Sequence, residues 1–158
     1  MKEIISHKIF CGEYETSIDE NGGFILPEAF REKLSSNADN KPQFYFLFLH
    51  DALCVFSVHV LHAMVDSFIN NQYQSLARAI WYLASDGQGE WSLEGKTHVP
   101  HPLLEQAGIL PGSKISLVGM KNRIEIWDTK QWKKHREEMN FLLEPFVKDI
   151  WSELDSLG

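Results

Sequence analysis

Short apolar segments separated by glycine- and proline-containing turns run along the chain, and their order occurs twice. In the first half we predict strands at residues 14–18 and 24–26. They flank a turn at residues 19–23, whose Asn and Gly residues accept the positive φ of tight turns. Pro27 suits the first turn of a helix predicted at 28–34. An apolar hairpin follows at 44–49 and 53–57. Apolar positions at three-to-four spacing then predict helices from Val58 and over 73–84.

The second half repeats this order. Strands are predicted at 90–93 and 97–99 around a turn at 94–95, and a short helix begins near Pro100 and ends at Gly108. A hairpin at 114–120 and 123–127 leads into a helix capped by Asp128 or Thr129, which Pro145 should break or kink. Gly95 follows Gly22 by 73 positions.

This repetition predicts an α+β protein that arose by internal duplication. One copy of about 45 residues is too small to bury its own strands, so we expect two copies to share one core around a pseudo-two-fold axis. The predicted organisation is a first repeat at 10–60, a helical connector at 61–86, a second repeat at 87–134 and a helical tail at 135–158. Internal two-fold symmetry also makes closed homo-oligomers plausible.

Composition is that of a globular protein. The 158 residues (18.2 kDa) are 44% hydrophobic and 23% charged, which excludes disordered and collagen-like classes. No apolar run approaches the roughly 20 residues of a membrane helix, and the N-terminal apolar stretch is too short for a signal peptide. We therefore predict a cytosolic protein in which Cys11 and Cys54 are free, buried thiols.

Charge is unevenly distributed around a net value of −7. Residues 96–136 contain eight basic and three acidic side chains, whereas residues 137–158 contain six acids and one base. The basic stretch is a candidate surface for nucleic acid, although taken alone it is more often a solvated surface with chance clustering of charge. The same two interpretations apply to the helix that carries Lys130, Lys133, Lys134 and Arg136.

Other candidate chemistry is weak. His98 and His101 lack further ligands at metal-binding spacing. The pair His50–Asp51 beside Cys54 lacks the electropositive setting that a nucleophilic thiol needs. Trp127 and Trp132 are expected to pack in the core. We predict neither enzymatic activity nor a metal or organic cofactor.

Several segments resemble the MraZ family of bacterial regulators. They are residues 12–27 (GEYETSIDENGGFILP), 103–109 (LLEQAGI), 117–119 (LVG) and 124–128 (IEIWD). The resemblance implies two swapped-hairpin domains of the SpoVT/AbrB type. It also implies a ring-like homo-oligomer that binds repeated double-stranded DNA sites upstream of a cell-division and cell-wall gene cluster, including its own gene. The expected location is the cytoplasm, associated with the nucleoid, with no membrane or small-molecule partner.

The signature of that family is Asp-x-x-Gly-Arg in each half, and the arginine is the residue expected to meet DNA. Here Gly23 stands at the first arginine position and Lys96 at the second. Lysine neutralises a phosphate but lacks the planar fork that reads a guanine edge. We expect Lys96, together with Asn21 in the first turn, to contact DNA. The alternative is an oligomeric protein-interaction module of the same fold that has lost or weakened DNA binding.

Overall fold

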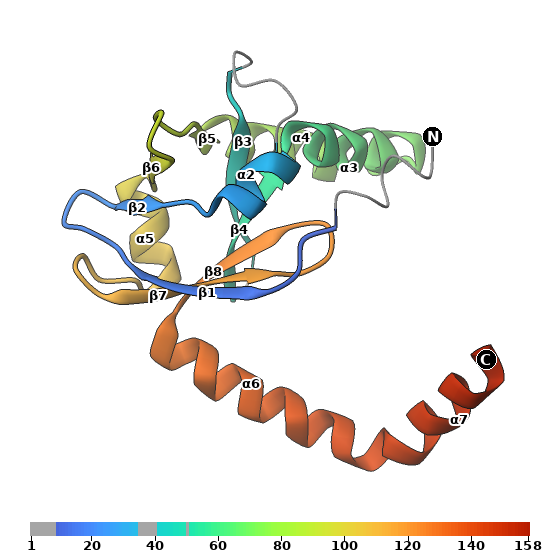
Figure 1. Ribbon diagram of the computed structural model, residues 1–158. Helices are drawn as coiled ribbons and strands as arrows, with labels where there is room; N and C mark the ends of the chain where they lie inside the picture. Colours follow the sequence, from blue (N-terminus) through green and yellow to red (C-terminus); the bar gives the residue numbers. More distant parts are fainter. Residues whose placement is uncertain (1–8, 35–40, 50) are drawn as a thin grey trace. The chain divides into compact units, whose positions relative to one another are not determined.

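The computed structural model describes residues 9–34, 41–49 and 51–158, and Figure 1 shows the order of its elements. The chain divides into two compact units, Met1–Asp128 and Thr129–Gly158, called here the N-terminal and C-terminal units. The N-terminal unit contains antiparallel sheets and helices, so the predicted α+β class is confirmed.

A six-stranded antiparallel sheet has the order β1-β7-β8-β4-β3-β5. Its strands are β1 Glu13–Ser17, β3 Phe44–Leu49, β4 Ala52–Ser57, β5 Gln88–Gly89, β7 Lys114–Gly119 and β8 Ile124–Asp128. A second sheet pairs β2 (Gly23–Ile25) with β6 (Lys96–His98). Both sheets therefore combine strands from the two halves of the sequence.

The large sheet is symmetric in its strand order. If each strand is replaced by its counterpart in the other half (β1 with β5, β3 with β7, β4 with β8), the same order is obtained from the opposite edge. The central strands β4 and β8 pair around Cys54 and Glu125, and β1 pairs with β7 as β5 pairs with β3. The strands on either side of the first turn, β1 and β2, lie in different sheets. Each half is thus completed by hydrogen bonds from the other.

Among the described residues of the N-terminal unit, the helices are α2 (Glu28–Leu34), α3 (Val58–Asn70), α4 (Gln74–Ser85) and α5 (His101–Ala107). The side chain of Ser57 accepts a hydrogen bond from Val60 N (3.1 Å) and caps α3. Gly108 ends α5 in the left-handed conformation, as predicted. Figure 1 shows α3 and α4 lying beside each other near β3.

The core draws its side chains from both halves. The Phe10 ring meets the Phe30 ring edge-on at 5.9 Å, and Phe44 meets Phe46 at 5.0 Å. All four belong to the first half and are at most 2% exposed, and they share one buried cluster with Leu104, Ile115 and Leu117 of the second half. Each such burial stabilises the fold by roughly 1.5–3 kcal/mol, so removing one half would open the core of the other.

The strand expected at residues 90–93 is absent, and that prediction was wrong. The strand of this segment is β5, immediately before it. Gly89 lies against the Phe44 ring at a distance that leaves no room for a Cβ, which brings the chain next to β3 there. The Trp91 ring then stacks on Phe44 (5.9 Å, 9°), and the backbone N–H of Trp91 donates to Gln43 Oε1 (2.8 Å). The strand therefore forms at β5 (Gln88–Gly89), because Gly89 allows the backbone to pack directly against the Phe44 ring.

The C-terminal unit consists of α6 (Thr129–Leu143), a 3₁₀ turn η1 (Glu144–Phe146) and α7 (Val147–Leu157). The predicted break at Pro145 is confirmed, because proline cannot donate the backbone hydrogen bond that a continuous helix needs. Trp127 and Trp132 are 9% and 5% exposed, as expected of packed side chains. Within the described ranges, no helix is both long and apolar enough to cross a membrane.

Candidate functional site

Two turns, one from each half, lie at the ends of the small β2–β6 sheet. The first comprises residues 19–23 and the second residues 92–96. Leu26 N donates to Gly95 O, and Val99 N donates to Gly22 O, both at 2.9 Å. Each turn is therefore held by the strand segment of the other half, and the two form one surface.

Glycine is required at the corner of each turn. Gly22 has φ +80° and Gly95 has φ +86°, a region that side-chain-bearing residues rarely adopt. A Cβ on Gly22 would lie 2.7 Å from Val99 O, and one on Gly95 would lie 2.8 Å from Arg31 Cζ. Each glycine therefore packs closely against a residue of the other half, with no room for a side chain.

Asp19 organises the first turn. Its Oδ1 accepts hydrogen bonds from Asn21 N (2.9 Å) and Gly23 N (2.7 Å). Its Oδ2 lies 2.9 Å from Lys96 Nζ. The hydrogen bond from Lys96 and those from the backbone stabilise the carboxylate, and they lower the pKa of Asp19 from 3.8 to about 2. In the second turn, the neutral Ser92 takes this place and accepts from Lys96 N (3.2 Å).

Lys96, the cation expected from the sequence, is therefore engaged in an ion pair across the two halves. The side chains of Lys96 and Asp19 remain 44% and 40% exposed, so an incoming anion can reach the ammonium group. Gly23 provides the space for this pair, because a Cβ there would lie 2.7 Å from both Asp19 Oδ2 and Lys96 Cε. Asn21 is exposed at the tip of the first turn.

The structure places two further residues at these turns: Arg31, which the sequence did not single out, and His98, which it offered only as a metal ligand. The guanidinium of Arg31, on α2, covers Gly95, and Arg31 Nε donates to Leu26 O (2.9 Å). His98 Nε2 lies 3.0 Å from the position that a Cβ on Gly23 would occupy. Arg31 follows Pro27 by one helical turn, but nothing in the local sequence indicates that the helix reaches the turn of the other half. The turn surface thus combines Lys96, Arg31 and His98 with acidic neighbours.

The basic stretch of the sequence is divided by the fold. Lys114 and Arg123 belong to the N-terminal unit, whereas Lys130, Lys133, Lys134 and Arg136 lie on α6 of the C-terminal unit. Arg123 forms an ion pair with the buried Glu125 (2.8 Å), whose other oxygen accepts from Trp127 Nε1 (3.0 Å). Arg123 is therefore engaged in holding a buried carboxylate.

The sequence also offered a possible metal site and a possible thiol site. Within the part of the chain that the structure describes, no group of three His, Cys, Asp or Glu side chains is arranged to hold a metal. Burial, followed by the nearby Glu125 charge, raises the pKa of Cys54 to about 12, so its thiol stays protonated and a poor nucleophile. His50 lies outside the described residues. Cys54 is buried as predicted, but Cys11 is exposed, and the prediction of its burial was wrong.

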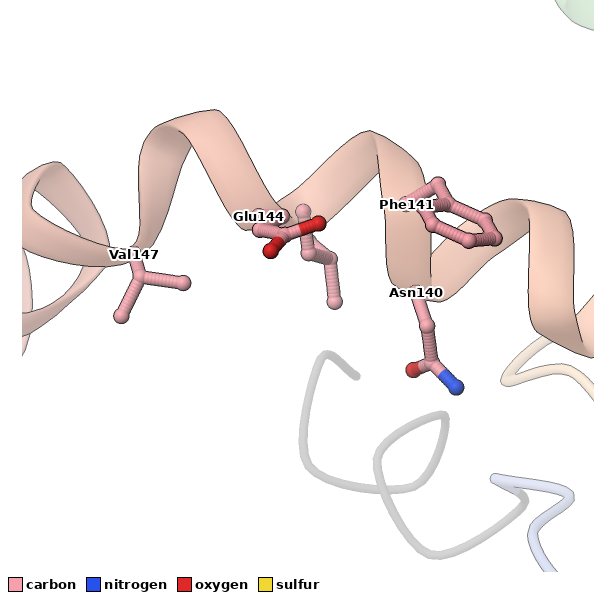
Figure 2. A pocket seen from close by; sticks show the side chains of 5 residues that line it. Asn140, Phe141, Glu144 and Val147 are labelled. Atoms are coloured by element: carbon pink, nitrogen blue, oxygen red, sulfur yellow. The ribbon is translucent and has the colours of Figure 1, made fainter.

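A hollow of about 410 Å³ lies at the bend of the C-terminal unit. Figure 2 shows Asn140 and Phe141 on α6 and Val147 beyond the bend, with Glu144 between them. Its lining is largely apolar and presents no cluster of titratable groups. The hollow therefore offers contact surface and no evident chemistry.

Comparisons with known proteins agree with the resemblance seen in the sequence. No family model matches. The chain is 26% identical over 149 residues to the transcriptional regulator MraZ of Acetivibrio thermocellus, covering 90% of this chain and 96% of the relative. It is 24% identical over 158 residues to the MraZ of Alkaliphilus metalliredigens, with coverage of 95% and 99%. The MraZ of Pediococcus pentosaceus is 27% identical over 136 residues, with coverage of 82% and 88%. The chain is thus similar to MraZ proteins along most of its length. Since the matches extend over nearly the whole of these MraZ proteins, the similarity includes both turns and both halves of the sheet.

Proposed function

We propose that this chain is a member of the MraZ family and a DNA-binding transcriptional regulator without enzymatic activity. The observation that carries the proposal is the similarity to proteins named as transcriptional regulators along most of the chain. We further propose that it binds repeated sites upstream of a cell-division and cell-wall gene cluster that includes its own gene. In this role it would act in the cytoplasm, associated with the nucleoid.

The two halves are proposed to be SpoVT/AbrB-type swapped-hairpin repeats, at 10–60 and 87–134. The symmetric strand order of the large sheet supports this assignment. The two equivalent backbone hydrogen bonds accepted by Gly22 O and Gly95 O, one in each turn, support it as well. Residues 61–86 would connect the repeats, and residues 135–158 would form the tail. A duplicated fold would present two similar turns to the DNA backbone at a fixed spacing.

The proposed DNA contacts are Lys96 and Asn21, with Arg31 added from the structure. Lys96 and Arg31 carry positive charge beside the second turn, and Asn21 is an exposed amide on the first. A DNA phosphate and the Asp19 carboxylate would compete for the ammonium group of Lys96. A single turn surface should therefore bind weakly.

Multivalency would compensate for weak individual contacts. We propose a ring-like homo-oligomer, supported by the many exposed apolar side chains of the C-terminal unit: Phe141, Leu142, Leu143, Phe146, Trp151, Leu154 and Leu157 are each more than half exposed. Several turn surfaces engaging repeated sites together raise affinity by roughly 10²–10⁴ without new contacts.

The second candidate is an oligomeric interaction module that has lost or weakened DNA binding. Gly23 at a signature arginine position and the engagement of Lys96 by Asp19 favour it. The net charge of −7 also opposes association with a polyanion.

A binding titration separates the two candidates. The full chain is titrated against duplex DNA from upstream of its own gene at several salt concentrations, with a shuffled duplex of equal length and composition as control. A regulator binds the upstream duplex more tightly, with an affinity that falls as salt rises, by a logarithmic slope of about 0.9 per phosphate neutralised. Equal weak binding to both duplexes supports the interaction module instead.

A further inference from the structure

The two halves differ in how one groove is filled. In the first half, Phe10 packs against Phe30 of α2 and is 2% exposed. Its backbone exchanges hydrogen bonds with Lys121, just beyond β7 (2.8 and 2.9 Å), and Gly12 O accepts from Gly119 N (2.8 Å). Residues 9–12 thus form an extended stretch, with the Phe10 ring as its aromatic side chain, beside α2 and the end of β7.

The corresponding place in the second half is a cavity of about 330 Å³. It is lined by β3, the end of α4 and the segment containing α5, with Phe46, Phe48, Leu83, Pro102, Leu103 and Gln106 among its walls. At the 73-residue spacing that relates Gly22 to Gly95, Leu103 corresponds to Phe30 and Leu83 to Phe10. Leu83 is 56% exposed, however, so the side chain in the position of Phe10 leaves the cavity open.

The edge of β3 beside this cavity is also open. β5 pairs only with Phe44 and Tyr45, and Gly87 O accepts from Phe46 N. Among the residues that the structure describes, none continues this pairing along the outer edge past Phe46. An unpaired strand edge next to an apolar cavity is the arrangement that captures extended peptides.

We propose that this cavity and the adjoining β3 edge bind an extended segment of another protein, with one aromatic side chain inserted in the cavity. The first half supplies the template, because Phe10 occupies the matching groove in this way. There, Lys33 Nζ donates to the carbonyl of Ile9, the residue before the aromatic (2.8 Å). Gln106 stands at the position corresponding to Lys33, and its carboxamide offers the equivalent donor.

The charge of the cavity lining indicates which side chains a partner would carry. Asp86 is the one charged residue among the described lining residues, which favours a basic side chain near the aromatic one. The chain's own extended aromatic segment already fills the first groove. The exposed aromatic residues Phe141, Phe146 and Trp151 lie on helical segments and do not match an extended binding mode. A different protein is therefore the partner that the geometry favours.

A peptide that copies the segment around Phe10 tests this directly. The probe is a fluorescent peptide with the sequence of residues 5–12, Ile-Ser-His-Lys-Ile-Phe-Ser-Gly, in which serine replaces Cys11. We expect saturable binding to the full chain, measured by fluorescence anisotropy. The same peptide with alanine in place of Phe10 should bind roughly 10- to 100-fold more weakly, because it loses the burial of one aromatic side chain.

Variants of the protein locate the binding. Leu83→Glu places a charge at the wall of the cavity and should weaken the peptide at least ~10-fold. Tyr82→Glu, at a 71% exposed neighbour outside the lining, is the matched control and should bind like the parent. Gln106→Ala should weaken binding by roughly 2- to 10-fold, as loss of one hydrogen bond does.

Three outcomes overturn the proposal. The peptide fails to bind at millimolar concentration, or Leu83→Glu binds it like the parent, or Leu83→Glu lowers the mass of the assembly in light scattering. The last result would assign the cavity to a second copy of this chain. The peptide is measured without DNA, so its result is independent of the upstream-duplex titration.

Discussion

The Asp19–Lys96 pair joins the two signature turns at the scale of single residues. A glycine at position 23 leaves room for the ammonium group of Lys96 to reach Asp19, at 2.9 Å. A side chain there would meet both partners, so Gly23 and the ion pair depend on each other. The absence of arginine from the first turn is therefore compatible with an organised site, in which one lysine is shared between a carboxylate of the protein and any anion that binds.

The first prediction concerns acid stability. Because the pKa of Asp19 is lowered from 3.8 to about 2 in the folded protein, its carboxylate contributes stability above about pH 4. That contribution is lost as pH falls from about 4 through 2. In Asp19→Asn it should be missing at every pH, so the melting temperature of this variant should fall less steeply over that interval than the parent's. Glu20→Gln, at the next exposed position, is the control and should keep the steep fall.

The second prediction concerns DNA. Lys96→Ala should nearly abolish binding to the upstream duplex, since every subunit of an oligomer loses its contact at once and small losses multiply. Its melting temperature at neutral pH should stay near the parent's, because exposed ion pairs contribute little to stability. Lys133→Ala, a lysine of α6, is the control and should bind nearly as the parent does. Parent-like binding by Lys96→Ala together with weak binding by Lys133→Ala would transfer the DNA contact to α6.

Asp19→Asn provides the opposite test of the same contact. Removing the competing carboxylate frees Lys96 for phosphate, so this variant should bind the upstream duplex more tightly than the parent, with a salt slope at least as steep. Weaker binding would indicate that the geometry of the first turn matters more than the charge of Lys96.

The sequence points to Lys96 as a candidate DNA contact but gives no sign of its ion-pair partner, Asp19. The cation was visible at a signature position, whereas Asp19 lies far away in the chain. The two meet only because β2 pairs with β6 in a register that places Ile25 opposite Lys96. Arg31 was missed for the same reason, since its role depends on the turn of the other half. Local patterns carry no information on pairing between distant strands.

At the scale of elements, most helices and strands followed their local signals. Pro27, Gly108 and Pro145 marked helix boundaries through backbone geometry that acts within a few residues. The strand at β5 was misplaced because its position depends on Gly89 packing against the Phe44 ring. The exposure of Cys11 was missed likewise, because apolar neighbours in the sequence do not reveal which side of an edge segment faces water.

The third prediction compares two glycines to separate two costs in the free energy of unfolding: backbone strain, and steric contact with the other half of the chain. Gly22 and Gly112 both have φ +80°, but only Gly22 lies against another backbone, with its Cβ position 2.7 Å from Val99 O. Gly112→Ala should therefore cost about 1–2 kcal/mol of unfolding free energy, the strain of the left-handed conformation alone. Gly22→Ala should cost roughly 2–4 kcal/mol, because Val99 O must also move. Urea unfolding measures both, and equal losses would mean that Gly22 is not held tightly against the backbone of Val99.

At the scale of the whole molecule, weak sites and unburied apolar surface argue for assembly. A turn surface that mixes cations with Asp19 and Glu94 is poorly suited to bind DNA singly, and a net charge of −7 opposes approach to a polyanion. In the proposed oligomer, repetition of the same surface would overcome both, because a second contact on one DNA molecule forms at high effective concentration. The C-terminal unit supplies apolar side chains in excess of what its own helices bury.

The fourth prediction follows from this excess. Ile150, Trp151 and Leu154 recur at helical spacing on α7, which has no buried residue. Burying such a row against other copies is the simplest way to remove it from water, so light scattering should return a mass above twice 18.2 kDa. Trp151→Glu should reduce that mass, because a charge would enter the contact. Ser152→Glu, the adjacent exposed position off the apolar row, should leave it unchanged.

The same pair of variants connects assembly to function. If avidity carries binding, Trp151→Glu should lose affinity for the repeated upstream sites by roughly 10²-fold or more while Lys96 remains intact. Its affinity for a duplex with a single site should change little, and Ser152→Glu should resemble the parent on both duplexes. A parent that remains a monomer at micromolar concentration would contradict the ring. A monomer that still bound repeated sites tightly would mean that one chain holds DNA through the paired turns alone, and that the apolar row on α7 serves another partner.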